Sequence, residues 1–123
     1  MIRGLIVGHA TFGDGILHAL KSIAGEFTCL ETISNDGLAT NELVEAIKEH
    51  TLSGGEEGTL IFVDLFGGSC WRAAKMAQTG HTRIVSGVNL PMVLSFLHKR
   101  ENRSTDSLAD IIETDAKRGV RVD

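Results

Sequence analysis

The chain has 123 residues, of which 42% are hydrophobic, and a formal charge of −4 at pH 7. This length predicts a single domain over residues 1–123 with its own core, and the apolar content argues against disorder. The acidic balance lacks the basic face that nucleic acids require, so we expect no nucleic-acid partner. The longest apolar runs are too short for a membrane span or a signal peptide, and the two cysteines form no CxxC motif. We therefore expect a reduced, cytoplasmic protein.

Apolar runs of strand length alternate along the chain with segments of helical periodicity. In chain order, we predict a strand at residues 2–7, a helix at 16–24, a strand at 27–33, a helix at 43–47, a strand at 59–63, a helix around 73–77, a strand at 83–86, a helix at 90–97, a helix around 108–112 and a short strand at 120–122. Thr40 or Asn41 would cap the second helix, which Gly54-Gly55 would end. Asn89 would cap the fourth helix, and Gly119 would close the last one.

Alternation of apolar strands with helices predicts an α/β fold whose sheet is mostly parallel and covered by helices on both faces. In such sheets the functional groups lie just beyond the carboxyl ends of the strands. Three segments follow strands there: Gly8-His9, the Asp64-Leu65-Phe66-Gly67-Gly68-Ser69 turn, and Gly87-Val88-Asn89. Because neighbouring strand ends share one edge, these segments are predicted to converge.

His9 is the first candidate for chemistry, although a lone histidine is more often structural. Its position after a strand and beside glycine favours function, and the free N–H groups at the start of the next helix, near Gly13, favour an anion such as phosphate. Gly8 and Gly13 have the spacing of a P-loop, but Asp14-Gly15 replaces the lysine and hydroxyl residue that the motif requires. The third glycine of a dinucleotide fingerprint is also absent.

Asp64 ends the third predicted strand and has three possible roles. It could cap the following turn, or it could accept a ring N–H from His9, fixing the tautomer so that the other nitrogen can attack. It could also be the phospho-acceptor of a receiver domain, but such a domain needs an acidic pair after its first strand, where this chain has Gly8-His9.

Gly67, Gly68 and Ser69 open the third predicted helix. They could form only a tight turn with Ser69 as the N-cap, or they could present backbone N–H groups and a hydroxyl to a phosphoryl group. Arg72 could assist or lie free on the surface. The other histidines show no ligand spacing with one another or with the cysteines, so we predict no metal site.

Three blocks, in order and over essentially the whole chain, resemble the mannose-family IIA domains of the bacterial phosphoenolpyruvate-dependent sugar phosphotransferase system. They are Gly8-His9 ahead of a helix, residues 63–69 (VDLFGGS) and residues 86–92 (SGVNLPM). The last two blocks are specific, whereas the histidine block alone would not be. The resemblance implies a flavodoxin-like sheet with helices on both faces.

The resemblance also implies a transferase that works through a phosphohistidine. His9 matches the residue that accepts a phosphoryl group from the phosphocarrier protein HPr and passes it to a IIB domain, and Asp64 matches the carboxylate that holds the ring. A cytoplasmic homodimer is implied, in which the C-terminal edge strand crosses to the partner subunit. The chain would meet the membrane sugar permease only through IIB. Neither a metal nor another cofactor is implied.

The chain departs from the family pattern at three positions. Many members have glycine at the position of Ala10, proline at that of Cys70 and tryptophan at that of Phe66. Alanine at position 10 changes the conformational freedom of the loop, and the other two departures change the preference for partner proteins. None of the three removes a reacting group. Phe66 and Trp71 could form a partner surface or pack in the core.

Two other functions stay open beside the phosphoryl carrier. A stand-alone domain with a phosphorylated His9 could report phosphorylation state to a kinase or a transcription factor rather than supply sugar uptake. A flavodoxin-like small-molecule binder would instead carry a chromophore or nucleotide on purification.

Overall fold

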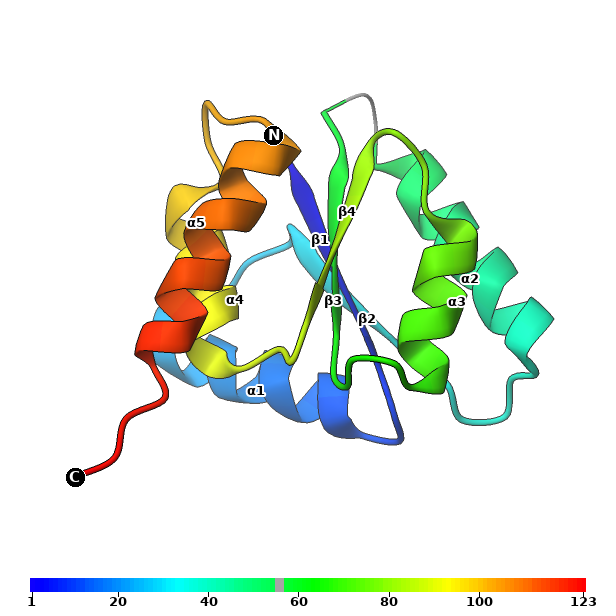
Figure 1. Ribbon diagram of the computed structural model, residues 1–123, viewed down its shortest axis with the longest axis horizontal. Coiled ribbons are helices and arrows are strands. Elements are labelled where there is room, and N and C mark those ends of the chain that lie inside the picture. Colours follow the sequence, from blue (N-terminus) through cyan, green and yellow to red (C-terminus); the bar gives the residue numbers. More distant parts are fainter. Residues whose placement is uncertain (55–56) are drawn as a thin grey trace.

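A four-stranded sheet forms the middle layer of the computed structural model, which describes residues 1–54 and 57–123 (Figure 1). Its strands are β1 (Arg3–Gly8), β2 (Leu30–Ser34), β3 (Thr59–Val63) and β4 (Thr82–Ser86). They lie in the order β2-β1-β3-β4, and every neighbouring pair is parallel. The predicted α/β class with a parallel sheet is therefore confirmed.

Helices cover both faces of this sheet (Figure 1). They are α1 (Phe12–Ala24), α2 (Thr40–Ser53), α3 (Ser69–Ala77), α4 (Leu90–Lys99) and α5 (Thr105–Arg118). One face packs against α1, α4 and α5, and the other packs against α2 and α3. Parallel strands need such crossover helices, so the layers follow from the alternation seen in the sequence.

The central strands supply alternate side chains to the two cores. On β3, Leu60 and Phe62 point into the core with α1, α4 and α5, whereas Ile61 and Val63 point into the core with α2 and α3. All four side chains are fully buried. A strand that is buried on both faces has no polar face to alternate with, and this is why the sequence shows an unbroken apolar run.

Several predicted element ends shift in the structure. Residues 27–29 precede β2 rather than belonging to it. Helix α2 begins after Ala39, whose backbone N–H donates to the Glu42 carboxylate at 2.9 Å, so neither Thr40 nor Asn41 is the N-cap. The helix ends at Ser53, and the predicted stop at Gly55 lies outside the described residues.

The caps at the end of the chain follow the sequence prediction. The Asn89 side chain accepts a hydrogen bond from the Met92 N–H at 2.9 Å, and Gly119 caps α5. Beyond it, residues 120–122 form no strand within this chain and extend away from the layers (Figure 1). Exchange of this segment between two subunits stays a prediction. Within the described ranges, no helix combines the length and apolarity needed to span a membrane.

The strand register brings the predicted segments to one edge of the sheet. Val7 on β1 pairs with Val63 on β3, and Val63 pairs in turn with Ser86 on β4. His9 and Asp64 therefore follow adjacent strands at the same level. This edge is where a parallel α/β sheet places its functional groups.

Candidate functional site

His9 and Asp64 meet at the carboxyl ends of β1 and β3. The Nδ1 atom of His9 lies 2.8 Å from Oδ2 of Asp64, and the backbone N–H of His9 donates to the same oxygen, also at 2.8 Å. The Asp64 side chain is 11% exposed, whereas that of His9 is 44% exposed. The carboxylate thus holds the ring from the protein side while the rest of the imidazole faces outward.

The electrostatics of Asp64 favour its ionised form. Burial alone would raise the pKa of this carboxyl group, but hydrogen bonds from the backbone and the ring of His9, together with the charge of His9, hold the pKa below its usual range. Asp64 is therefore a carboxylate at neutral pH and can only accept at Oδ2. An accepting Oδ2 places the ring proton on Nδ1 and leaves the lone pair on Nε2.

The Nε2 atom of His9 lies at the start of α3. Ser69 is the first residue of that helix, and its Oγ lies 3.1 Å from Nε2. Gly68 occupies the N-cap position, so the alternative in which Ser69 caps the helix is wrong. Backbone N–H groups in the first turn of a helix have no carbonyl partner within the helix, so this end favours an anion.

The two glycines before α3 shape the turn. Gly67 has a φ of +81°, which favours glycine, and Gly68 donates its N–H to the carbonyl of Leu65 at 3.2 Å. The Gly68 N–H is therefore committed to the turn. A Cβ on Gly68 would lie 3.7 Å from Cε1 of His9, in contact with the ring. Glycine here keeps the space beside the ring open.

Gly13, at the start of α1, has a packing role that the sequence did not predict. A Cβ at this position would lie 1.9 Å from Oγ1 of Thr32 on β2. A side chain at this position would collide with Thr32, so Gly13 allows the close packing of α1 against β2.

The loop that carries His9 is held by the end of β2. Ala10 has a φ of +51°, in the left-handed region that disfavours alanine. Its N–H donates to Oδ1 of Asn35 at 3.2 Å, and its carbonyl accepts from Oγ of Ser34 at 2.8 Å. These bonds stabilise the conformation that many members of the resembled family would reach with glycine.

Cys70 is a part of the site that the sequence did not predict. Its side chain is fully buried. Its Sγ lies 3.7 Å from Nδ1 of His9. Burial, followed by the charge of Asp64, raises the pKa of the Cys70 thiol to about 11, so it is protonated at neutral pH. The neighbouring Ser69 could have signalled this proximity in the sequence.

An exposed apolar rim, formed by Leu65 and Phe66, lies in the turn between Asp64 and α3. Leu65 and Phe66 are 61% and 71% exposed, so Phe66 is not a core residue. Its ring packs edge-on against Trp71, with centroids 5.0 Å apart, and Trp71 in turn packs against the core. Apolar and aromatic side chains of this kind are typical of protein–protein contacts.

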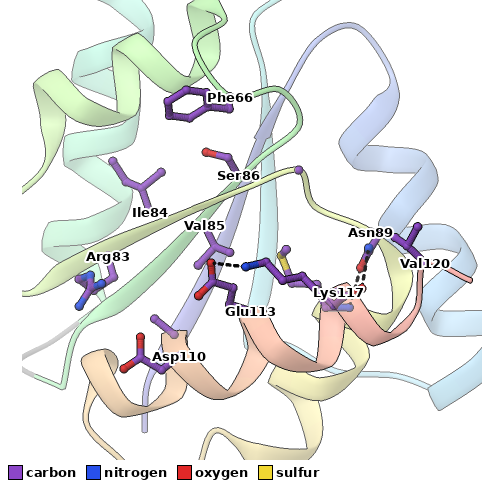
Figure 2. Close-up of a pocket in the computed structure, with 14 residues that line it drawn as sticks. Phe66, Arg83, Ile84, Val85, Ser86, Asn89, Asp110, Glu113, Lys117 and Val120 are labelled. Carbon is purple, nitrogen blue, oxygen red and sulfur yellow. Dashed lines mark hydrogen bonds and ion pairs between the residues drawn. The ribbon is translucent and has the colours of Figure 1, made fainter.

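The third predicted segment serves the structure instead. Asn89 caps α4 and also donates from Nδ2 to the carbonyl of Ala116 at 3.3 Å, tying α4 to α5. Gly87 and Asn89 line a groove of about 470 Å³ between β4 and α5, and His9 is not among its lining residues (Figure 2). Phe66 and Val120 border the same groove.

The sequence of this chain is similar to those of known proteins. Residues 4–113 match the profile of the family described as "PTS system fructose IIA component". The PTS system fructose-specific EIIA component of Bacillus subtilis strain 168 is 28% identical over 129 residues, covering 99% of this chain and 86% of the relative.

Solved structures of similar proteins share the whole fold. The phosphotransferase system component EIIA from Streptococcus agalactiae is 26% identical, with a TM-score of 0.90, covering 99% of this chain and 97% of that one. The mannose/sorbose-specific IIA subunit from Enterococcus faecalis is 20% identical, with a TM-score of 0.84 and coverage of 98% and 93%. At that identity, the second structure supports the fold alone.

Proposed function

We propose a phosphoryl-carrier role for His9, starting from the premise that this chain belongs to the family of PTS system fructose IIA components. In this proposal, His9 accepts the phosphoryl group of phospho-HPr and passes it to a IIB domain. The observation that supports it best is the orientation of the ring, with Nδ1 held by Asp64 and Nε2 turned toward the start of α3.

The proposed reaction begins with the lone pair on Nε2. This nitrogen attacks the phosphorus of the phosphohistidine on HPr, a new P–N bond forms, and the bond to the donor ring breaks with its electron pair returning to that ring. The His9 ring gains positive charge as the bond forms. Asp64 stabilises this charge through the Nδ1–H hydrogen bond, in the way that a triad aspartate supports its histidine.

The phosphoryl oxygens would be held by the start of α3. The first-turn N–H groups of Ser69 and Cys70 and the hydroxyl of Ser69 are the proposed donors, while Gly67 and Gly68 shape the loop around them. In the resting state, the Ser69 hydroxyl lies within hydrogen-bonding distance of Nε2. It would turn from the ring nitrogen to a phosphoryl oxygen as the new bond forms.

The exposed position of the histidine fits a protein donor rather than a small molecule. A small-molecule site buries most of its ligand in a pocket, whereas here the His9 side chain is 44% exposed and the turn after Asp64 carries the exposed side chains of Leu65 and Phe66. We propose that this rim contacts HPr and then IIB. Both transfers connect similar phosphoramidates, so the reaction is expected to run in either direction.

The homodimer predicted from the sequence resemblance requires a surface with which the exchanged strand can pair. Strand β4 lies at the edge of the sheet, and the groove beside it runs along α5 (Figure 2). Val120 and Val122 are 75% and 98% exposed in the single chain. We propose that residues 120–122 of a second subunit pair with the free edge of β4, which removes both the open edge and the exposed valines.

The test of the carrier proposal is phosphorylation with phosphoenolpyruvate, enzyme I and HPr. We expect one phosphoryl group per chain, labile in acid and stable in alkali, as for a phosphoramidate and unlike an acyl phosphate on Asp64. His9→Ala should abolish labelling without unfolding the protein, because the backbone N–H of residue 9 still satisfies Asp64. His18→Ala, on the exposed side of α1, is the matched control. Full labelling of His9→Ala refutes the proposal.

A further inference from the structure

The site contains three side chains that can bind a metal, although the sequence predicted none. His9, Asp64 and Cys70 each offer one ligand atom, and these atoms all lie within 4.8 Å of one another. We propose that a divalent ion of the zinc type binds to Nδ1 of His9, the carboxylate of Asp64 and the thiolate of Cys70, and that it blocks phosphorylation of His9. The blocking effect rests on the proposed function, whereas the metal site does not.

The two distances from Nδ1 of His9 to the other ligand atoms are within about half an ångström of those in a tetrahedral zinc site. With bonds of about 2.0 Å to nitrogen and oxygen and about 2.3 Å to sulfur, neighbouring ligands lie about 3.3 to 3.5 Å apart. The structure has 3.7 Å between Nδ1 and Sγ, and 2.8 Å between Nδ1 and Oδ2. An ion would therefore replace the Nδ1 proton and separate His9 from Asp64 by about half an ångström. The His9 side chain is 44% exposed, which leaves space for this movement of the ring.

Asp64 offers a second observation that favours a cation. Its Oδ1 atom is buried and has no hydrogen-bond partner among the described residues, and both bonds from His9 end on Oδ2. A buried carboxylate oxygen without a partner is costly, and a bound cation compensates its charge. The anionic carboxylate and a thiolate from Cys70 together balance the two charges of the ion. Three protein ligands leave the fourth tetrahedral position to water.

Protons must move when the ion binds. The Cys70 thiol releases its proton to solvent when its sulfur binds the ion, because only the thiolate is a metal ligand. Binding is therefore expected to strengthen as the pH rises. The imidazole stays neutral, and its one proton moves from Nδ1 to Nε2 because the metal uses the Nδ1 lone pair.

This change of tautomer explains the expected inhibition. Phosphoryl transfer requires a lone pair on Nε2, and a metal on Nδ1 places the proton there instead. The ion also displaces the Asp64 hydrogen bond that stabilises the charged ring. Metal-bound and phosphoryl-accepting states of His9 therefore exclude each other. Many members of the resembled family have proline at the position of Cys70, so they lack this thiol ligand.

Cobalt(II) is a suitable probe because its bond to a thiolate absorbs in the near ultraviolet. Titration of the reduced full-length chain should give one cobalt ion per chain with this charge-transfer band. Cys70→Ala should lose the band, and Cys70→Ser repeats the test if the alanine variant does not fold. Cys29→Ser is the matched control, because Cys29 lies in the opposite core and should leave the band unchanged. A wild-type chain without the band, or a band that survives in both Cys70 variants, overturns the metal site.

A second measurement tests inhibition separately. Zinc added during phosphorylation by phospho-HPr should inhibit the wild type and Cys29→Ser, and Cys70→Ala should need at least roughly tenfold more zinc for half-inhibition relative to its own metal-free rate. The Cys70 variant also reports any effect of zinc on HPr and enzyme I. Equal zinc sensitivity of the variants overturns the inhibition. If the metal-free wild type is not phosphorylated at all, the proposed function fails, and the cobalt titration still decides the metal site.

Discussion

Replacing Asp64 by asparagine tests whether the carboxylate assists phosphoryl transfer or only secures a loop. Both hydrogen bonds from His9 end on Oδ2, so the amide oxygen should take that position and its NH₂ group the place of Oδ1. The reverse orientation would set the NH₂ group against the backbone N–H of His9, with two donors facing each other. The variant therefore keeps the ring tautomer and removes mainly the charge.

The expected loss of stability is modest. A hydrogen bond to a charged acceptor contributes about 1 kcal/mol more than one to a neutral acceptor, so two such bonds predict a loss of about 2 kcal/mol. The amide nitrogen replaces Oδ1, which already lacks a hydrogen-bond partner among the described residues, so the change at this atom adds little to the loss of stability. The melting temperature should fall by several degrees.

The expected loss of transfer rate is much larger. Two unit charges about 4 Å apart interact by about 4 kcal/mol at an effective dielectric constant near 20. The ring is partly exposed and gains its charge only partly in the transition state, so roughly 2–3 kcal/mol of stabilisation disappears with the carboxylate charge. This corresponds to a slowing of roughly 30- to 150-fold.

Rapid-quench measurement of transfer from phospho-HPr to each variant checks this prediction. Asp106→Asn makes the same chemical change at an exposed ion pair with Arg83, on the opposite end of the sheet. This control should keep the wild-type rate and lose less than about 1 kcal/mol of stability. A wild-type rate for Asp64→Asn, with the expected loss of stability, would refute the reasoning and leave Asp64 a structural role.

Three further predictions concern stability and assembly. The pKa of Asp64 is lowered in the folded state, so its charge stabilises the fold above the ordinary pKa of 3.8, and this contribution is lost as the pH falls through the folded pKa. In urea titrations, the difference in stability between the wild type and Asp64→Asn should therefore shrink below about pH 4. Ala10→Gly should stabilise the left-handed loop by up to about 1 kcal/mol, whereas Ala10→Val should destabilise it by about 1–2 kcal/mol, and equal urea midpoints would contradict the strain at this position. Light scattering should give about twice 13.2 kDa for the full chain and a weaker dimer after removal of residues 120–123; a full-length monomer at tens of micromolar would exclude strand exchange.

Local patterns in the sequence were sufficient to predict the architecture. The apolar runs gave all four strands of the sheet, and the helical stripes gave the helices between them, because burial on one or both faces imposes its period directly on the residue order. Asn89 was also predicted correctly as an N-cap, because an N-cap depends only on contacts within one helical turn. The N-cap of α2 was wrong because the Glu42 carboxylate bonds back to the Ala39 backbone, which frees that position from needing a polar side chain.

The sequence also placed His9 and Asp64 at the same edge, because parallel strands end together. What it could not determine was which atoms meet there. The tertiary structure decided that Oδ2 of Asp64 takes both bonds from His9, that Ser69 faces Nε2, and that Cys70 is buried against Nδ1. These contacts span 55 to 61 residues of the chain, and they depend on how closely α3 packs against β1 and β3. Residue types and spacing predict which segments approach one another, but only the packing of side chains sets the few ångströms that determine the tautomer of His9 and create the proposed metal site.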